Sequence, residues 1–154
     1  NEAIQFIINE VQWSYLLVFF ILFFLGGYLL YSGLMAAIGA AVDEEADTQQ
    51  FLLPLTIPMV FAILMASKVI DDPSSSLAFW LSEIPFTSPI IMIVRIAMGI
   101  GDSSVEIWEI ILSLFLLTIT FIGTTWLSGR IYRKGILSYG KKASYSDLFK
   151  WLKN

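Results

Sequence analysis

The chain has 154 residues, of which 57% are hydrophobic and only 14% are charged, and its mean hydropathy is +0.77. A soluble domain of this size carries about a quarter charged residues, so the composition excludes an ordinary water-soluble domain and favours a membrane protein. The net charge of −4 indicates little about partners, because acidic and basic residues occupy different segments. The absence of cysteine and histidine removes disulfides, thiol nucleophiles, Cys/His metal sites and histidine acid–base catalysis.

Residues 1–13 are predicted to form a short amphipathic helix that leads into the membrane. Its apolar residues recur at helical spacing, at Ile4, Ile7, Ile8 and Val11. No basic region precedes the apolar run that follows, so we do not interpret that run as a signal peptide.

A first transmembrane helix is predicted over residues 14–42. No charge occurs from Val11 to Val42, and a helix of that run would be roughly 48 Å long, more than the ~30 Å hydrocarbon core requires. Small residues recur four apart at Gly33, Ala37 and Ala41, and again at Ser32, Ala36 and Ala40. Because helices in lipid associate by close packing, Gly33, Ala37 and Ala41 form a candidate helix-packing face, either static or part of a moving interface.

An acidic turn is predicted over residues 43–50. It carries four carboxylates, those of Asp43, Glu44, Glu45 and Asp47. Asp47, with Gln50 three residues later, is a candidate cap for the next helix. Two interpretations stay open: a solvated, capped turn, or a contact with a basic surface on a cytoplasmic partner. A cation site within the membrane is disfavoured, because the carboxylates lie at the end of the span.

A second transmembrane helix is predicted over residues 51–70. Pro54 and Pro58 lie four residues apart within it. Each removes a backbone donor and clashes with the preceding turn, so we expect a kink or local unwinding. Because freed carbonyls in lipid must be satisfied by neighbours, we expect this face to be buried against other helices.

Residues 71–104 are predicted to form an extracytoplasmic re-entrant hairpin. Residues 84–101 are uncharged except for Arg95 and contain Pro85 and Pro89. The apolar part is short for a span, and an arginine at the bilayer centre costs ~2.5–3.5 kcal/mol. We therefore expect the segment to dip in and return, with Arg95 snorkelling outward. A full crossing is the alternative.

A third transmembrane helix is predicted over residues 105–129, followed by a basic tail over residues 130–154. The tail holds seven of the nine basic residues: Arg130, Arg133, Lys134, Lys141, Lys142, Lys150 and Lys153. The positive-inside rule places it in the cytoplasm, and with three crossings the acidic turn lies on the same side. The tail ends in a short basic amphipathic helix suited to an anionic membrane surface. The predicted fold class is an all-α membrane protein with three transmembrane helices, a re-entrant or interfacial hairpin and this amphipathic C-terminal helix.

The sequence carries no recognisable catalytic chemistry. Gly99 and Gly101 are not followed by the lysine and hydroxyl residue of a phosphate-binding loop. No serine stands beside a plausible base, and the clustered carboxylates lie in a turn where their pKa values have little reason to shift. We therefore predict no catalytic, cofactor-binding or metal-binding residue, no nucleic-acid binding and no enzymatic activity.

Several motifs resemble one family. The stretches MAAIGAAV, DEEADTQQ and LLPLTIP, then IPFTSPIIMIVR and RIYRKGIL, resemble the membrane subunit of type-two ATP-binding-cassette (ABC) exporters, and more narrowly the NatB-like branch of export permeases. The resemblance covers most of Tyr28–Leu137.

The resemblance implies a permease subunit in the cell (inner or plasma) membrane that pairs with a second permease subunit, identical or different. A separate ABC ATPase subunit would bind and hydrolyse ATP, so no cofactor is expected on this chain. Asp43, Glu44, Glu45 and Asp47 would contact that ATPase, and Pro85, Pro89 and Arg95 would belong to an outer gate. The family also implies further spans upstream, where the principal coupling helix would lie. The competing hypothesis is a non-transporting assembly or anchoring subunit of an envelope complex.

Overall fold

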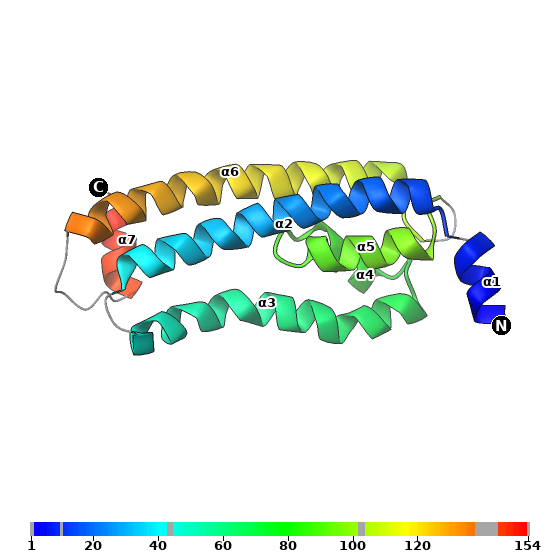
Figure 1. The fold of residues 1–154 in the computed structure, drawn as a ribbon, viewed down its shortest axis with the longest axis horizontal. Coiled ribbons are helices and arrows are strands. Elements are labelled where there is room, and N and C mark those ends of the chain that lie inside the picture. The colour runs from blue at the N-terminus through cyan, green and yellow to red at the C-terminus, as the bar shows by residue number, and fades with distance from the viewer. Residues whose placement is uncertain (1, 10, 43–44, 102–103, 138–144, 154) are drawn as a thin grey trace.

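The computed structural model describes residues 2–9, 11–42, 45–101, 104–137 and 145–153 (Figure 1). Within these ranges the chain forms helices α1 (Glu2–Asn9), α2 (Trp13–Ala41), α3 (Glu45–Asp71), α4 (Ser76–Glu83), α5 (Ser88–Met98), α6 (Ile107–Leu137) and α7 (Tyr145–Lys153). Among the described residues, the nearest approach to a sheet is an isolated bridge between Ile100 and Val105. Helices α2, α3 and α6 are each long and apolar enough to cross a membrane. The predicted all-α membrane fold with three spans is therefore confirmed.

Helices α2 and α6 lie side by side along most of the molecule (Figure 1). Their interface buries large apolar side chains completely or almost completely, among them Phe23, Leu30 and Leu117. The approach is close at Gly26, where an added Cβ would lie 2.6 Å from Leu117 Cδ2. Close packing at a small residue supplies the dispersion contacts that hold helices together where lipid is as apolar as the side chains.

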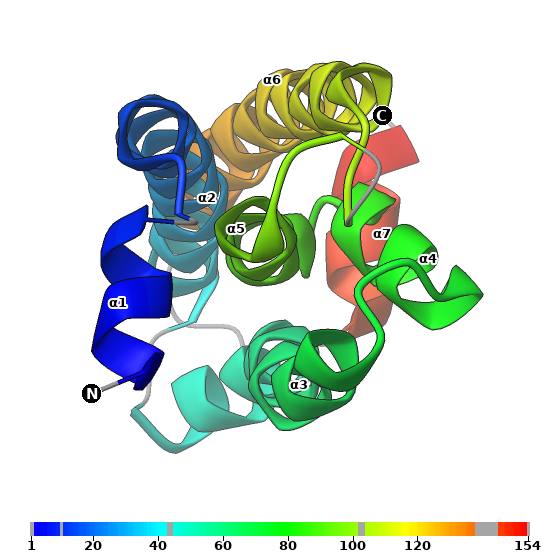
Figure 2. The same cartoon turned by 90° about the vertical axis from the view of Figure 1, so that its right-hand side faces the viewer.

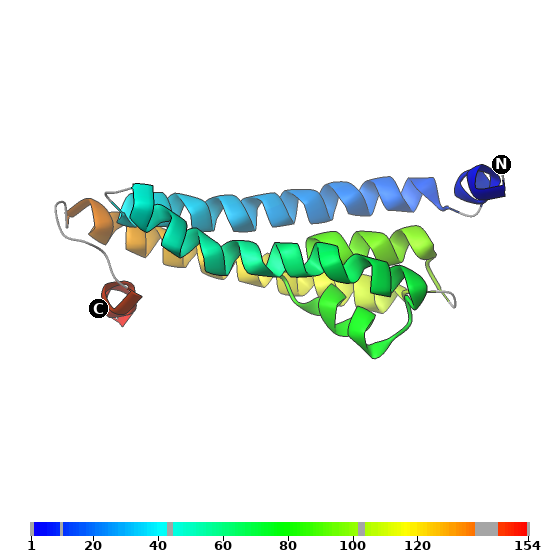
Figure 3. The same ribbon diagram turned by 90° about the horizontal axis from the view of Figure 1, so that it is seen from below.

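The α4–α5 hairpin occupies one end of the bundle, with α5 between α2, α3 and α6 (Figure 2). The 11 residues of α5 make a helix of about 16 Å, roughly half of the ~30 Å hydrocarbon core. Both helices of the hairpin stay within one half of the length of the bundle (Figure 3). Ser75 caps α4 by accepting a hydrogen bond from the Ala78 N–H at 3.2 Å.

Helix α3 differs in two respects from the helix expected over residues 51–70. It begins at Glu45 and remains helical through Pro54 and Pro58, so the expected local unwinding is absent. A proline removes one backbone hydrogen bond, and the remaining bonds of this helix keep it continuous. Pro54 is exposed and Pro58 half-buried, so the described helices of this chain do not cover this face, and its burial against other helices stays a prediction.

The start of α3 also corrects the capping prediction for Asp47. The helix begins two residues before Asp47, so Asp47 lies in its first turn and cannot be its N-cap. An acid in that position still interacts favourably with the positive end of the helix dipole. Asp43 and Glu44 lie outside the described residues, and for Glu45 only the backbone is described.

The end of α2, the start of α3, the end of α6 and helix α7 gather at one end of the bundle (Figure 1). The hairpin and α1 lie at the opposite end. The acidic turn and the basic tail therefore adjoin the same end, although α6 continues to Leu137 instead of ending at residue 129. We call the acidic turn of residues 43–50 the elbow and the end of the bundle that it adjoins the elbow end. The opposite end, with α4, α5 and α1, is the hairpin end.

Candidate functional site

Arg95 is the largest fully buried side chain among the described residues, with 2% of its surface exposed. Its Nε donates to the Pro73 carbonyl at 2.9 Å and its Nη1 to Ser82 Oγ at 2.8 Å. Its Nη2 donates to the Ser104 carbonyl at 2.8 Å. The guanidinium reaches toward the loops at the hairpin end, but the protein satisfies its donors, so the expectation that Arg95 snorkels outward to water is wrong.

The charge of Arg95 is balanced by Glu109 of α6, whose Oε1 lies 3.2 Å from Arg95 Nη2. The same carboxylate accepts a 2.7 Å hydrogen bond from the Glu106 N–H. Glu106 directly precedes α6, so Glu109 occupies the position from which a capping-box glutamate reaches back to the N-cap residue. The Glu109 carboxylate thus accepts a hydrogen bond from a backbone N–H at the start of α6 and also neutralises the buried arginine.

Glu83, at the end of α4, is a second buried carboxyl group near this ion pair. It is 4% exposed, and within the described residues neither of its oxygens has a hydrogen-bond partner. Burial raises the pKa of Glu83, the negative charge of Glu109 adds to this effect, and Arg95 opposes both, so that the resulting pKa is about 7. A carboxyl group in this setting holds a proton at a pH where exposed glutamates are ionised. We call Ser82, Glu83, Arg95, Ser104 and Glu109 the Arg95 cluster.

The Arg95 cluster ties together segments that are far apart in the sequence. Besides the contacts of Arg95, Ser113 Oγ of α6 donates to the Ser82 carbonyl at 2.6 Å, and Ser104 Oγ donates to the Arg95 carbonyl at 2.9 Å. A buried ion pair resists separation, because removing one partner leaves an uncompensated charge. The cluster therefore attaches the hairpin to the start of α6 as one unit.

The other side of the hairpin is attached to α2. Tyr31 donates its hydroxyl hydrogen to the Phe86 carbonyl at 2.6 Å, and the two rings meet edge to face. One turn earlier, Gly27 faces Pro89 so closely that an added Cβ would lie 2.8 Å from the proline ring. These two contacts hold the start of α5 and the turn before it against the middle of α2.

An apolar groove of about 390 Å³ runs beside these contacts, between α2, α3 and the hairpin. Its lining is mostly aromatic and aliphatic: Phe20, Phe24, Gly27, Tyr28, Tyr31, Ser32, Met35, Met59, Phe86, Pro89 and Ile90. Phe20, Phe24 and Tyr28 stack successively along its rim. Such a groove suits an apolar surface more than a charged ligand.

The structure separates the predicted site residues into three places. Ala37 and Ala41 are buried and Gly33 is half-buried, with Thr125 of α6 as its nearest neighbour, whereas Ala36 of the second stripe is exposed. Pro85 and Pro89, both half-buried, lie with Arg95 at the hairpin. The acidic turn belongs to the elbow end, so it does not share a site with the hairpin. Within the described residues, no group of His, Cys, Asp or Glu side chains could hold a metal ion.

Sequence reasoning missed Glu83, Glu109, Gly27 and Tyr31. A signal was present for the two glutamates, because an arginine in an apolar segment of a membrane protein requires a partner of opposite charge. Glu83 and Glu109 flank the segment that contains Arg95. No comparable signal marks Tyr31, since its partner is a backbone carbonyl.

Three apolar spans, and a short hairpin held to α6 by a buried ion pair, define a polytopic helical membrane protein. A family model described as "ABC-2 family transporter protein" matches residues 3–130. The chain belongs to this family, and the resemblance to its members is confirmed at that level.

The chain is also similar to two curated proteins. It is 28% identical over 131 residues to "Uncharacterized protein YhaP" of Bacillus subtilis, a match that covers 85% of this chain and 30% of that protein. It is 25% identical over 136 residues to "Uncharacterized protein MJ1024" of Methanocaldococcus jannaschii, covering 88% of this chain and 33% of that protein. The chain thus spans about a third of the length of these relatives. No solved structure matches it significantly.

Proposed function

We propose that this chain is part of the membrane-spanning permease of an ATP-driven ABC exporter in the inner or plasma membrane. In this proposal it forms part of the translocation path beside a second permease subunit, and a separate ATPase subunit binds and hydrolyses ATP. The family match over residues 3–130 carries the proposal. The NatB-like branch remains a prediction.

The elbow end is the proposed contact for the ATPase, with the C-terminal tail in the cytoplasm. Two observations support this choice. The acidic turn joins α2 directly to α3, and it adjoins the same end of the bundle as the basic residues of α6 and α7 (Figure 1). A cytoplasmic tail follows from the positive-inside rule, and the turn would then face the same compartment as the ATPase.

The helix contacts suggest how a force on the elbow would reach the opposite end. Helices α2 and α3 leave the elbow together, and both pack on α5. A change in their separation would pull on α5 through Gly27–Pro89 and Tyr31–Phe86 on the α2 side. The Arg95 cluster would resist that pull from the α6 side. The hairpin would then shift as a unit and reshape the apolar groove, in the manner of a gate.

Charge reversal at the elbow tests this proposal. The triple variant Asp43→Lys, Glu44→Lys and Glu45→Lys of the full-length protein replaces attraction to a basic ATPase surface with repulsion. We expect at least about a tenfold loss of ATPase co-purification, measured with a nucleotide photolabel, and a parallel loss of transport-stimulated ATP hydrolysis in proteoliposomes.

A matched control reverses three charges at the hairpin end: Glu2, Asp71 and Asp72, of which all three are exposed. It should retain ATPase binding. Insertion is checked with a cysteine introduced at the exposed position Phe149. Residues 1–154 contain no cysteine, and any cysteine elsewhere in the full-length protein is first replaced by serine. Wild-type ATPase binding by the elbow variant, or equal losses in both variants, would contradict the coupling role of the acidic turn.

A further inference from the structure

The last turns of α6 form a basic pocket of about 290 Å³ lined by Trp126, Arg130, Arg133 and Lys134. Among the described residues, no carboxylate lines it, and neither Arg133 nor Lys134 forms an ion pair. Three cations around one small cavity repel each other unless an anion lies between them. The pocket therefore has the charge of an anion site without an acidic partner from the described chain.

Two contacts hold the Arg130 side chain in place, so one side of the pocket is ordered without a ligand. Its guanidinium lies over the Trp126 ring, 4.2 Å from the ring centroid. Its Nη1 donates to the Leu152 carbonyl of α7 at 3.2 Å. That carbonyl is in the last turn of α7, where the helix leaves carbonyls without a partner. Arg130 thus docks α7 beside the pocket, and Arg133 and Lys134 remain available to a ligand.

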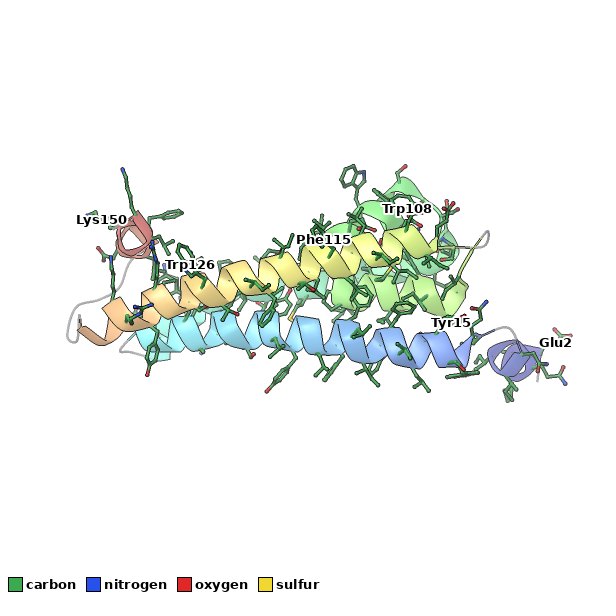
Figure 4. The ribbon with its side chains drawn as sticks, turned by 90° about the horizontal axis from the view of Figure 1, so that it is seen from above. Glu2, Tyr15, Trp108, Phe115, Trp126 and Lys150 are labelled. Atoms are coloured by element: carbon green, nitrogen blue, oxygen red, sulfur yellow. The ribbon has the colours of Figure 1, made fainter. Side chains whose placement is uncertain are left out.

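An apolar stripe leads along α6 into the pocket. Phe115, Ile119, Ile122 and Trp126 recur at helical spacing, and each is more than half exposed. Figure 4 shows Phe115 and Trp126 along α6, with α7 and its Lys150 beside the far end. Arg130 and Arg133 continue the same face of the helix. A ligand that fits both parts carries an apolar chain and a negatively charged head.

The position of the pocket along α6 also suits a lipid headgroup. No charge occurs from Ile110 to Gly129, a run about long enough to cross the hydrocarbon core, so we expect Arg130, Arg133 and Lys134 directly after it to stand where the core meets the headgroups. Tryptophan and arginine are typical of that boundary.

We propose that the basic pocket binds one anionic phospholipid, with its phosphate between Arg130, Arg133 and Lys134 and an acyl chain along Phe115–Trp126. This is a discrete site, distinct from the general attraction of a basic helix to a negative surface. It does not depend on the proposed transport function, because a transporter and an anchoring subunit would bind the lipid equally.

Lipid retention by the full-length protein in detergent, measured by native mass spectrometry, tests the site. Dioleoyl phosphatidylglycerol and dioleoyl phosphatidylcholine share acyl chains and differ in headgroup charge. We expect the wild type to prefer phosphatidylglycerol. The variant Arg133→Gln, Lys134→Gln should bind it roughly thirty-fold more weakly, at about 1 kcal/mol per cation, with phosphatidylcholine binding unchanged.

Two control variants separate the pocket from general charge. Lys150→Gln, Lys153→Gln removes the same charge from α7, outside the pocket lining, and should retain phosphatidylglycerol within about threefold. The exchange Arg133→Lys, Lys134→Arg keeps both charges and should also retain it, and circular dichroism checks that every variant is folded.

Equal wild-type retention of the two lipids would overturn the proposal, as would equal losses in the two glutamine variants. A millimolar excess of inorganic phosphate should leave phosphatidylglycerol bound. If it displaces the lipid, the pocket is a site for a free anion and the lipid assignment is wrong.

Discussion

Gly27 of α2 lies directly against Pro89 of α5, and a Cβ at Gly27 would stand 2.8 Å from both Cβ and Cγ of the proline ring. Real side chains do not approach so closely, and a proline ring in the first turn of a helix cannot rotate away. The hairpin therefore packs on α2 only because residue 27 has no side chain. This contact lies one turn from the hydrogen bond between Tyr31 and the Phe86 carbonyl.

Gly27→Ala is expected to destabilise the protein by about 1–3 kcal/mol, because α5 must move away from α2 to admit the methyl group. The matched control is Gly39→Ala in the same helix, where an added Cβ meets no atom within 4 Å. Alanine there should be neutral or stabilising by roughly 0.5–1 kcal/mol. Thermal unfolding in detergent, followed by fluorescence-detected gel filtration, measures both. Equal midpoints for the two variants would contradict the packing described for the hairpin.

Replacement of Arg95 should be among the most damaging substitutions in the chain. Arg95→Met leaves Glu109 as a buried charge without its partner, and such a loss costs about 3–5 kcal/mol. Adding Glu109→Gln to Arg95→Met removes that charge while keeping a side chain that can still accept from the Glu106 N–H.

The double variant is therefore expected to be more stable than Arg95→Met alone, which a double-mutant cycle of unfolding midpoints would measure. If the two substitutions instead add independently, Arg95 and Glu109 do not form a coupled pair.

Glu83 should make the stability of the hairpin depend on pH. Its pKa is raised from the ordinary glutamate value of 4.5 to about 7 in the folded protein, so the folded state binds the proton more tightly than the unfolded state does. The free energy of unfolding is then highest below about pH 4.5 and falls as the pH rises through about 7.

The comparison with Glu83→Gln isolates this effect, because glutamine keeps the size of the side chain but does not titrate. The difference in unfolding midpoint between wild type and variant should grow in favour of Glu83→Gln from pH 5 to pH 8. A constant difference over this range would mean that Glu83 is ionised in the folded protein as in the unfolded chain.

The sequence by itself determined the membrane class and the number of spans. Runs of apolar residues as long as those of α2, α3 and α6 have few stable alternatives to membrane helices, since a helix satisfies its own backbone hydrogen bonds in lipid. The contrast between the acidic turn of residues 43–50 and the basic tail of residues 130–154 is likewise a property of the sequence. These conclusions needed no knowledge of which residues meet.

The tertiary structure decided which polar groups are paired and which small residues are essential. Arg95 was predicted to reach water, because a sequence shows the cost of a buried arginine but not the carbonyls of Pro73 and Ser104 that satisfy it. Position 27 requires glycine because the Pro89 ring packs directly against it, and the sequence around Gly27 does not show this contact. Both outcomes depend on contacts between segments far apart in the chain, and helical periodicity carries information only about neighbours within one helix.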